Sequence, residues 1–329
     1  MKVLVVGGTG FMGQNIVPLL KEKGYDVTIL ARDEKKVHEL FGNQFDYILG
    51  DIADASTIDG CCDDMDIVIN LAALMGHDLP SEEAFAKFRK VNVQGLENLV
   101  SEAKKANVVR FIHISSTAAM GLQNQVVLDE NTICKPFTPY QVTKFEGEKI
   151  LIDAYNDYSF PAVILRPSMV YGPGFKGDFL TIAKVCKYGV FPKIGFGKNL
   201  SPALYISDLA EMVVRFIECG RNGEVYLVSS SKSFELADEV HIIGKALNKK
   251  VHMVLCPRFL AVFGASILEK FFTIIGKKPL VTKRNILSVS QDRIIDTSKM
   301  REAIGYEAKV EIEEGLTNTI SYFVGEKYI

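Results

Sequence analysis

Short runs of Val, Ile and Leu alternate with longer segments of helical periodicity through the first two-thirds of the chain. Six runs are predicted strands, at residues 2–6, 26–31, 46–49, 66–70, 110–114 and 162–166. They lack the polar alternation of half-exposed strands, which is typical of strands covered on both faces. The segments between them predict helices, among them residues 11–23, 82–106 and 139–156. Such alternation predicts right-handed crossovers, and therefore an α/β fold with a doubly wound parallel sheet.

The pattern changes after residue 171. Glycine and proline become frequent, beginning with Gly172-Pro173-Gly174, and helices and isolated strands follow. We therefore predict a main domain over residues 1–171 and a smaller C-terminal lobe over residues 172–329. Residues 206–219 have helical periodicity, and we expect residues 204–228 to return to the main sheet.

Composition and charge narrow the class of protein. Hydrophobic residues make up 48% of the 329 residues, and the formal net charge is −2 without a Lys/Arg stripe that would indicate a nucleic-acid partner. The six cysteines form no C-x-x-C pair, so we expect neither a metal site nor disulfides. The most apolar later stretch, residues 259–268, is too short for a transmembrane segment, which needs about 20 residues. Because the first strand begins without a secretory signal, we expect a cytoplasmic protein that at most associates with a membrane surface.

A glycine-rich turn joins the first predicted strand to the first helix. Glycine stands wherever a Cβ atom would obstruct the tight turn, the approach of a pyrophosphate or the packing of the helix on the strand. This position makes the turn a predicted dinucleotide site, with contacts from Gly7, Thr9, Gly10, Phe11, Met12 and Gly13. The alternative is a turn with a purely structural role.

The tip of the second strand bears on the choice of cofactor. An acidic residue there would bind the ribose hydroxyls of NAD, whereas a small residue followed by arginine suits a 2′-phosphate. Ala31 and Arg32 occupy the tip, so among NAD(P) cofactors we favour NADP(H) over NAD(H). Asp33 comes later, where it can cap the next helix, and Arg32 can also be a plain surface residue.

The ends of the third and fourth strands complete the predicted cofactor site. After the third strand, Asp51 can accept a hydrogen bond from the adenine amino group while Ile52 packs on the ring. After the fourth come Leu71, Ala72 and Ala73, a segment whose small residues let the backbone approach the middle of the cofactor. Strand termination is the alternative in both places.

Candidate catalytic residues follow the fifth strand and open a helix. Ser115-Ser116-Thr117 ends the strand, and Tyr140 and Lys144 lie four residues apart, on one face of the helix. A free tyrosine has a pKa near 10 and is a poor base. A neighbouring ammonium group favours the phenolate, so we expect a lowered pKa for Tyr140. A serine can then hydrogen-bond the substrate oxygen, and Lys144 can reach the nicotinamide ribose.

With these motifs in this order, the chain resembles the extended short-chain dehydrogenase/reductase family, including the NAD-dependent epimerase/dehydratases. The resemblance spans nearly the whole chain, through residues 7–13, 51–52, 70–73, 91–93, 115–121, 140–144 and 165–173. It implies a Rossmann-type sheet and an NAD(P)-dependent enzyme that transfers hydride at a secondary alcohol or ketone carbon of a small molecule. It also implies a homodimer built on the helices around residues 92–106 and 140–156.

The resemblance assigns roles to individual residues. A serine five residues before the glycine of the strand-five motif is catalytic in that family, so Gly121 selects Ser116 over Ser115. Asn92 is implied as a structural residue of the cofactor site. Nicotinamide and substrate contacts are implied for residues 166–173, so we assign Pro167 and Met169 with Ser115 to the cofactor, and Thr117 and Ser168 with Ser116 to the substrate. Arg166 is equally suited to a buried ion pair.

The C-terminal lobe offers fewer signals. Sugar-nucleotide members of the family have an arginine-rich stretch here, whereas this chain has Lys198, which lacks the bidentate fork of arginine. Lys198 and Arg293 are candidate contacts for an anionic substrate, and we expect Asp208 to cap a helix.

Three functions remain open at this stage. A nucleotide-sugar epimerase or dehydratase is the first. Residues 258–272 are more apolar than such a site needs and resemble the same region of 3β-hydroxysteroid dehydrogenase and dihydroflavonol reductase. The second hypothesis is therefore an NADPH-dependent reductase of a bulky hydrophobic ketone, although a packing helix explains the stretch equally well. A cofactor-binding scaffold without turnover is the third.

Overall fold

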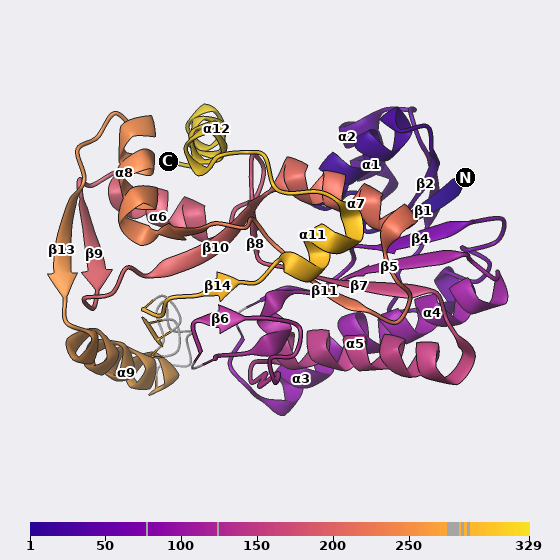
Figure 1. Cartoon of the computed structure of the whole chain (residues 1–329), viewed down its shortest axis with the longest axis horizontal. Helices are drawn as coiled ribbons and strands as arrows, with labels where there is room; N and C mark the ends of the chain where they lie inside the picture. Colours follow the sequence, from indigo (N-terminus) through magenta and orange to yellow (C-terminus); the bar gives the residue numbers. More distant parts are fainter. Residues whose placement is uncertain (77, 124, 275–282, 284–285, 288–289) are drawn as a thin grey trace.

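A parallel sheet of seven strands forms the centre of the computed structural model, which describes residues 1–76, 78–123, 125–274, 283, 286–287 and 290–329 (Figure 1). All of its neighbouring strands are parallel. Because β4 returns to the opposite side of β1 from β2, the sheet is doubly wound, and the predicted α/β fold is confirmed. The order is β3 (Asp46–Leu49), β2 (Asp26–Ala31), β1 (Lys2–Val6), β4 (Ile67–Asn70), β5 (Arg110–Ile114), β7 (Ala162–Pro167) and β11 (Val225–Val228).

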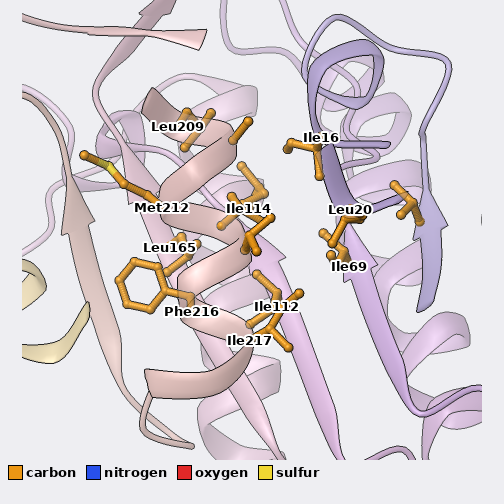
Figure 2. Packing of buried hydrophobic residues seen from close by; sticks show 14 of the residues in the cluster. Ile16, Leu20, Ile69, Ile112, Ile114, Leu165, Leu209, Met212, Phe216 and Ile217 are labelled. Carbon is orange, nitrogen blue, oxygen red and sulfur yellow. The ribbon is translucent and has the colours of Figure 1, made fainter. Parts of the chain in front are cut away.

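Helices cover both faces of this sheet. One face carries α1 (Gly13–Glu22), α2 (Glu34–Phe41), α7 (Ile206–Cys219) and α11 (Ser298–Ile304), and the other carries α4 (Gly95–Lys105) and α5 (Pro139–Tyr158), with α3 (Glu82–Arg89) beside α5. Each face has its own cluster of buried apolar residues. In Figure 2, Leu209 and Phe216 of α7 lie against Ile114 and Leu165 of the sheet. Helix α7 and strand β11 therefore pack with the main sheet although they follow residue 171.

The remaining elements form a second layer beside the carboxyl ends of the strands. Its core contains buried apolar side chains from β8 and β10 and from the helices α6, α8 and α12. The strands are β8 (Met169–Tyr171), β9 (Val190–Ile194), β10 (Leu200–Tyr205), β12 (Ser233–Glu235) and β13 (His252–Cys256), and the helices are α6 (Asp178–Cys186), α8 (Leu236–Ala246), α9 (Arg258–Ile274) and α12 (Ile312–Gly325).

Two short pairings connect this lobe to the main sheet. Strand β10 pairs with β8, which continues from β7 after a single residue. Strand β14 (Ile294–Ile295) pairs with β6 (Val127–Leu128), which follows the 3-10 turn η3 (Thr117–Met120) at the end of β5. Residues far apart in the sequence are thereby brought to the edge of the sheet where the site is predicted.

Asp208 has a different role from the one expected. It lies in the first turn of α7 and is 2% exposed, and its carboxylate accepts hydrogen bonds from the Tyr306 hydroxyl (2.8 Å) and the amides of Lys309 (2.9 Å) and Val310 (3.0 Å). The prediction of a helix cap was wrong, because these donors come from a segment about 100 residues away. Asp208 anchors the C-terminal segment to α7.

Strand β3 also departs from expectation. Both of its end residues are exposed, because β3 is the edge strand of the sheet, whereas the sequence predicted a strand covered on both faces. No helix among the described residues has the length and apolarity that crossing a bilayer requires.

Candidate active site

The glycine turn leaves β1 in a conformation that requires glycine. Gly7 has φ +79°, and a Cβ atom there would lie 3.0 Å from the amide nitrogen of Ala72. A Cβ atom on Gly13 would lie 2.1 Å from the carbonyl oxygen of Gly8, so α1 can begin here only with glycine. Within the described part of the chain, the hydrogen bonds leave the N–H groups of Phe11 and Met12 without an acceptor. The turn therefore fits a pyrophosphate, which accepts from such amides at a helix N-terminus.

Aromatic side chains pack beside this turn. The Phe11 ring lies 4.9 Å from that of Phe175, centroid to centroid. Cβ atoms built on Gly172 and Gly174 would lie 3.7 Å and 3.9 Å from the Phe11 ring. The Gly172–Gly174 turn after β8 thus lies against Phe11 of the glycine turn, and Thr9 of the same turn is partly exposed.

The tip of β2 carries an ion pair. The guanidinium of Arg32 lies 3.7 Å from the carboxylate of Asp51, and the Arg32 side chain is 74% exposed. Asp33 caps α2 by accepting from the amides of Lys35 and Lys36, as the sequence suggested. Ile52 is buried, at the position where a Cβ atom on Gly95 of α4 would collide with it.

The end of β4 is held by buried polar side chains. Asn70 accepts from the amide of Ala72 (3.1 Å), and its side-chain nitrogen lies 3.2 Å from Nδ1 of His113 on β5. Burial, with a contribution from Lys144, lowers the pKa of His113 well below its usual value, so this imidazole is neutral at physiological pH. These contacts fix the backbone of Leu71, Ala72 and Ala73 beside the glycine turn.

Asn92 holds the loop that follows. The predicted helix 82–106 is interrupted by a π-helical turn, η2 (Lys90–Gln94), that carries this side chain. Asn92 accepts from the amide of Leu74 (2.7 Å) and donates to the Leu74 carbonyl (3.0 Å) and to the Thr143 hydroxyl (3.0 Å). It therefore ties the loop after β4 to α5.

The two serines after β5 point to different partners. The Ser115 hydroxyl donates to the buried carboxylate of Glu148, and its amide donates to the Leu165 carbonyl (2.7 Å). The Ser116 hydroxyl accepts from the amide of Ala118 (3.1 Å) and hydrogen-bonds the Tyr140 phenol. Only Ser116 therefore reaches the predicted base, in agreement with the selection made through Gly121.

Helix α5 presents Tyr140 in its first turn. The helix begins with a capping box, in which Thr138 and Gln141 each accept from the other's backbone amide, and Pro139 occupies the first position. Burial raises the pKa of Tyr140, and the Ser116 hydrogen bond only partly opposes it. We expected Lys144 to lower the pKa of Tyr140. That expectation is wrong for this structure, because the net shift is upward and the interaction that opposes it comes from Ser116.

The Lys144 side chain points to a backbone carbonyl of β5 and not to the Tyr140 phenol. It is 2% exposed, and its ammonium donates to the carbonyl oxygen of Ile114 at the end of β5 (2.6 Å). Burial lowers the pKa of Lys144 from 10.5 to about 8, although the charge of Glu148 opposes this. A lysine with this pKa can exchange its proton near physiological pH.

Beneath Lys144, one helical turn farther along α5, lies a buried ion pair. The Glu148 carboxylate accepts from Arg166 Nε (2.9 Å) and from a terminal guanidinium nitrogen (2.6 Å), and the two side chains are 1% and 5% exposed. Of the two roles open to Arg166, the structure supports the buried ion pair. Glu148 and His113 were missed by the sequence analysis, although Glu148 continues the four-residue spacing of Tyr140 and Lys144.

Known proteins resemble this chain in sequence and in fold. A model of the "NAD dependent epimerase/dehydratase family" matches residues 3–229. The chain belongs to this family. The prediction of an NAD(P)-dependent enzyme with this fold is therefore confirmed.

Similar proteins span the whole length of this family member. A UDP-glucose 4-epimerase of Vibrio cholerae is 27% identical over 328 residues, covering 98% of this chain and 95% of its own. An N-acetyl-alpha-D-glucosaminyl-diphospho-ditrans,octacis-undecaprenol 4-epimerase of Escherichia coli O157:H7 is 27% identical over 323 residues, covering 97% and 94%. A UDP-glucuronic acid 4-epimerase from Bacillus cereus, solved in complex with NAD, has a TM-score of 0.77 at 24% identity, with 100% of both chains covered.

The candidate substrate residues of this epimerase/dehydratase family member come from both the main domain and the C-terminal lobe. Ser168 is 6% exposed and shares a hydrogen bond with Ser229 (2.8 Å), so its hydroxyl is already engaged. Lys198 is exposed and pairs with Glu235 (2.7 Å). The amide of Arg293 donates to the Leu200 carbonyl (2.9 Å), which brings Arg293 to the strand that begins two residues after Lys198.

The other assigned residues lie on the main domain. Pro167 ends β7, Met169 begins β8, and Thr117 begins η3 directly after Ser116. Pro167 ends the strand next to β5 and Met169 follows it, and Thr117 follows β5 itself. All three therefore belong to the same edge of the sheet as Ser116.

Proposed function

We propose that this protein interconverts a nucleoside-diphosphate sugar by NAD-dependent oxidation and reduction at one ring carbon. The observation that carries the proposal is the hydrogen bond between Ser116 and Tyr140, with Lys144 one turn away, at the same sheet edge as the glycine turn. Bound in that turn, NAD supplies a hydride acceptor that becomes the donor when the hydride is returned. A scaffold that only binds cofactor has no need for this arrangement of Ser116, Tyr140 and Lys144.

In this proposal Tyr140 and Ser116 handle the proton. Tyr140 takes the proton of the substrate hydroxyl as hydride leaves the carbon, and gives it back when the carbonyl is reduced. Ser116 orients the same oxygen and shares its hydrogen bond with the phenol. Because burial raises the pKa of Tyr140, the resting phenol is protonated and must first release its proton to solvent, so that the phenolate can accept the substrate proton and later return it to the developing alkoxide.

Lys144 would bind the cofactor in this proposal. Its ammonium is held by the Ile114 carbonyl and has a pKa of about 8, so it is charged at neutral pH and can hold the nicotinamide ribose beside Tyr140. The Arg166–Glu148 pair fixes the helix turn beneath it and lets Glu148 balance that charge. We assign Glu148 a positioning role.

The geometry of the glycine turn indicates which residues would bind the cofactor. Phe11 and Met12 would offer amides to the pyrophosphate, and Asp51 would receive the adenosine end. The preference for NADP(H) that the sequence suggested through Arg32 stays a prediction. The Arg32–Asp51 ion pair disfavours it, because a 2′-phosphate bound to Arg32 would be repelled by the nearby Asp51 carboxylate. The NAD complex of the similar Bacillus cereus epimerase agrees, so we propose NAD(H) as the working cofactor.

Titration calorimetry of the wild type and of Arg32→Ala with NADH and NADPH tests this choice. We expect the wild type to bind NADH at least as tightly as NADPH, and Arg32→Ala to leave NADH binding within about threefold. Tighter binding of NADPH that disappears in Arg32→Ala would restore the original preference.

The proposed substrate class rests on the similar proteins, because the lobe lacks an arginine cluster. Both curated relatives described above are 4-epimerases of diphospho-sugars. The exposed cations Lys198 and Arg293 would lie toward the diphosphate in this proposal, although the Lys198–Glu235 pair must open for that contact. We propose the sugar C4 as the reacting carbon on the same basis.

Incubation with UDP-glucose, UDP-glucuronic acid and hydrophobic ketones, followed by chromatography of the products, tests the function. We expect conversion of a UDP-sugar without net consumption of added cofactor. Oxidation of added NADPH that depends on a hydrophobic ketone, with every sugar unchanged, would favour a reductase. Cofactor binding without either conversion would favour a scaffold.

Oligomeric state, location and the boundary after residue 171 stay predictions. We propose a homodimer through α4 and α5, and sedimentation equilibrium with a mass near 73 kDa, twice the 36.5 kDa of the chain, would support it. A mass equal to one chain would refute it. The cytoplasmic location is tested by fractionation of cells that express the protein.

A further inference from the structure

Helix α9 turns its large apolar side chains toward solvent. Phe259, Leu260, Phe263 and Ile267 are 71%, 51%, 66% and 52% exposed. At 100° per residue they fall within an arc of about 100° on one side of the helix. Ala265, which is 3% exposed, lies on the opposite side. A helix that only packs against its own protein buries its large residues and exposes its small or polar ones, so this orientation is the reverse of the usual pattern.

The apolar surface extends beyond the helix. Phe196, 82% exposed, follows β9, and the preceding Gly195 donates its amide to the Cys256 carbonyl at the end of β13 (2.9 Å). A Cβ atom on Gly195 would lie 3.9 Å from Cβ of Arg258. Phe196 therefore lies beside the first turn of α9. We call Phe196, Phe259, Leu260, Phe263 and Ile267 the α9 surface.

Positive charge accompanies this surface. The segment 258–284 contains six Lys and Arg residues against a single Glu, so it carries +5 in a chain whose total is −2. Two of these cations are exposed and can be placed. Arg258 opens α9, and the backbone amide of Lys283 donates to the Glu269 carboxylate (3.0 Å) in the second half of the helix. Cations therefore flank the α9 surface at both ends.

Apolar residues on one helix face and cations at its borders fit one partner better than others. An anionic bilayer offers an apolar interior at the depth of the acyl chains and phosphates at the level of the cations. A second copy of a chain with net charge −2 would match the apolar side chains, but its own α9 segment would place like charges against one another. Because the exposed apolar side chains lie on one side of α9, the helix would insert parallel to the membrane plane.

We propose that the α9 surface docks the protein peripherally onto an anionic lipid bilayer. The Phe and Ile side chains enter the boundary between headgroups and acyl chains, and Arg258 and Lys283 contact lipid phosphates. Docking does not depend on the sugar substrate or on the cofactor, so it stands or falls separately from the proposed activity.

Flotation of the full-length protein with lipid vesicles tests the proposal. One vesicle set is pure phosphatidylcholine, and the other contains about 30% phosphatidylglycerol, which carries the anionic charge. We expect binding to the anionic set, weaker binding at 0.5 M salt because charges are screened, and little binding to pure phosphatidylcholine. Phe259→Ser/Phe263→Ser should lower the partition coefficient at least about tenfold, because two exposed rings no longer enter the membrane.

The matched control replaces exposed apolar residues elsewhere. Val109→Ser/Ile133→Ser changes side chains that are 58% and 75% exposed outside the α9 surface, and should float like the wild type. Both variants should keep the wild-type circular dichroism and melting temperature. The proposal is overturned if the wild type does not float, if both double variants float equally well, or if Phe259→Ser/Phe263→Ser only converts a dimer into a monomer.

Discussion

Replacing Lys144 with methionine should stabilise the protein while it destroys the activity. Lys144 is 2% exposed and contacts the Ile114 carbonyl, and its charge is balanced only in part by Glu148. Methionine has a similar length and no charge, so it fills the same space. Glu148 keeps its partners Arg166 and Ser115 in the variant, so no buried carboxylate is left unpaired.

The magnitude follows from the pKa. A folded-state pKa of about 8 against 10.5 means that burying the ammonium costs about 3 kcal/mol at pH 7. The variant also loses the hydrogen bond to the Ile114 carbonyl, which destabilises it by roughly 1 kcal/mol, so the net increase in the free energy of unfolding is about 2 kcal/mol. Below pH 8 both states bind the proton and the full cost is present. Between pH 8 and 10.5 the folded state loses its proton first, so the cost and the advantage of methionine both decline.

Urea unfolding at pH 7 and pH 10 measures this difference. We expect Lys144→Met to be more stable than the wild type at pH 7 and nearly equal to it at pH 10. Lys245→Met is the control, because Lys245 is an exposed lysine paired with Glu313, and its loss should matter by less than about 1 kcal/mol. A less stable Lys144→Met at pH 7, or an advantage that does not change with pH, would refute the reasoning.

Two further predictions concern the turn and the ion pair. Gly13→Ala places a Cβ atom 2.1 Å from the Gly8 carbonyl oxygen, so we expect loss of NAD binding in calorimetry together with a lower melting temperature; normal binding would contradict the geometry. Arg166→Met leaves the buried Glu148 carboxylate without its cation, so we expect the free energy of unfolding, measured in urea, to fall by about 3–5 kcal/mol. The double variant Arg166→Met/Glu148→Met removes both charges and should recover most of that loss. Equal stability of the single and double variants would count against the pair.

The sequence predicted the main sheet well because each buried strand is a local pattern. All six predicted strands exist within about a residue of their predicted ends, and the glycine turn lies between β1 and α1 as expected. Strand β3 was misjudged because exposure at the sheet edge depends on the order of strands. Asp208 was misjudged because its partners, such as Tyr306, are distant in the sequence.

The site was only partly predictable for the same reason. The spacing of Tyr140 and Lys144 gave their shared helix face, and Gly121 separated the roles of Ser116 and Ser115. The direction of the pKa of Tyr140 depends on burial and on where the Lys144 ammonium points, which no spacing encodes. The ion pair between Arg32 and Asp51 likewise joins two strand ends that the sequence treated separately.

The coupling of proton and hydride transfer through Tyr140 is tested most directly by a single-turnover measurement. Wild type and Tyr140→Phe are brought to equal NAD content, verified by calorimetry, and mixed with a UDP-sugar that the wild type converts, while absorbance at 340 nm reports reduced cofactor. We predict equal NAD binding and a rate at least about a hundredfold lower in Tyr140→Phe, because phenylalanine lacks the phenolate oxygen that accepts the substrate proton. Reduction at the wild-type rate in Tyr140→Phe would contradict the account.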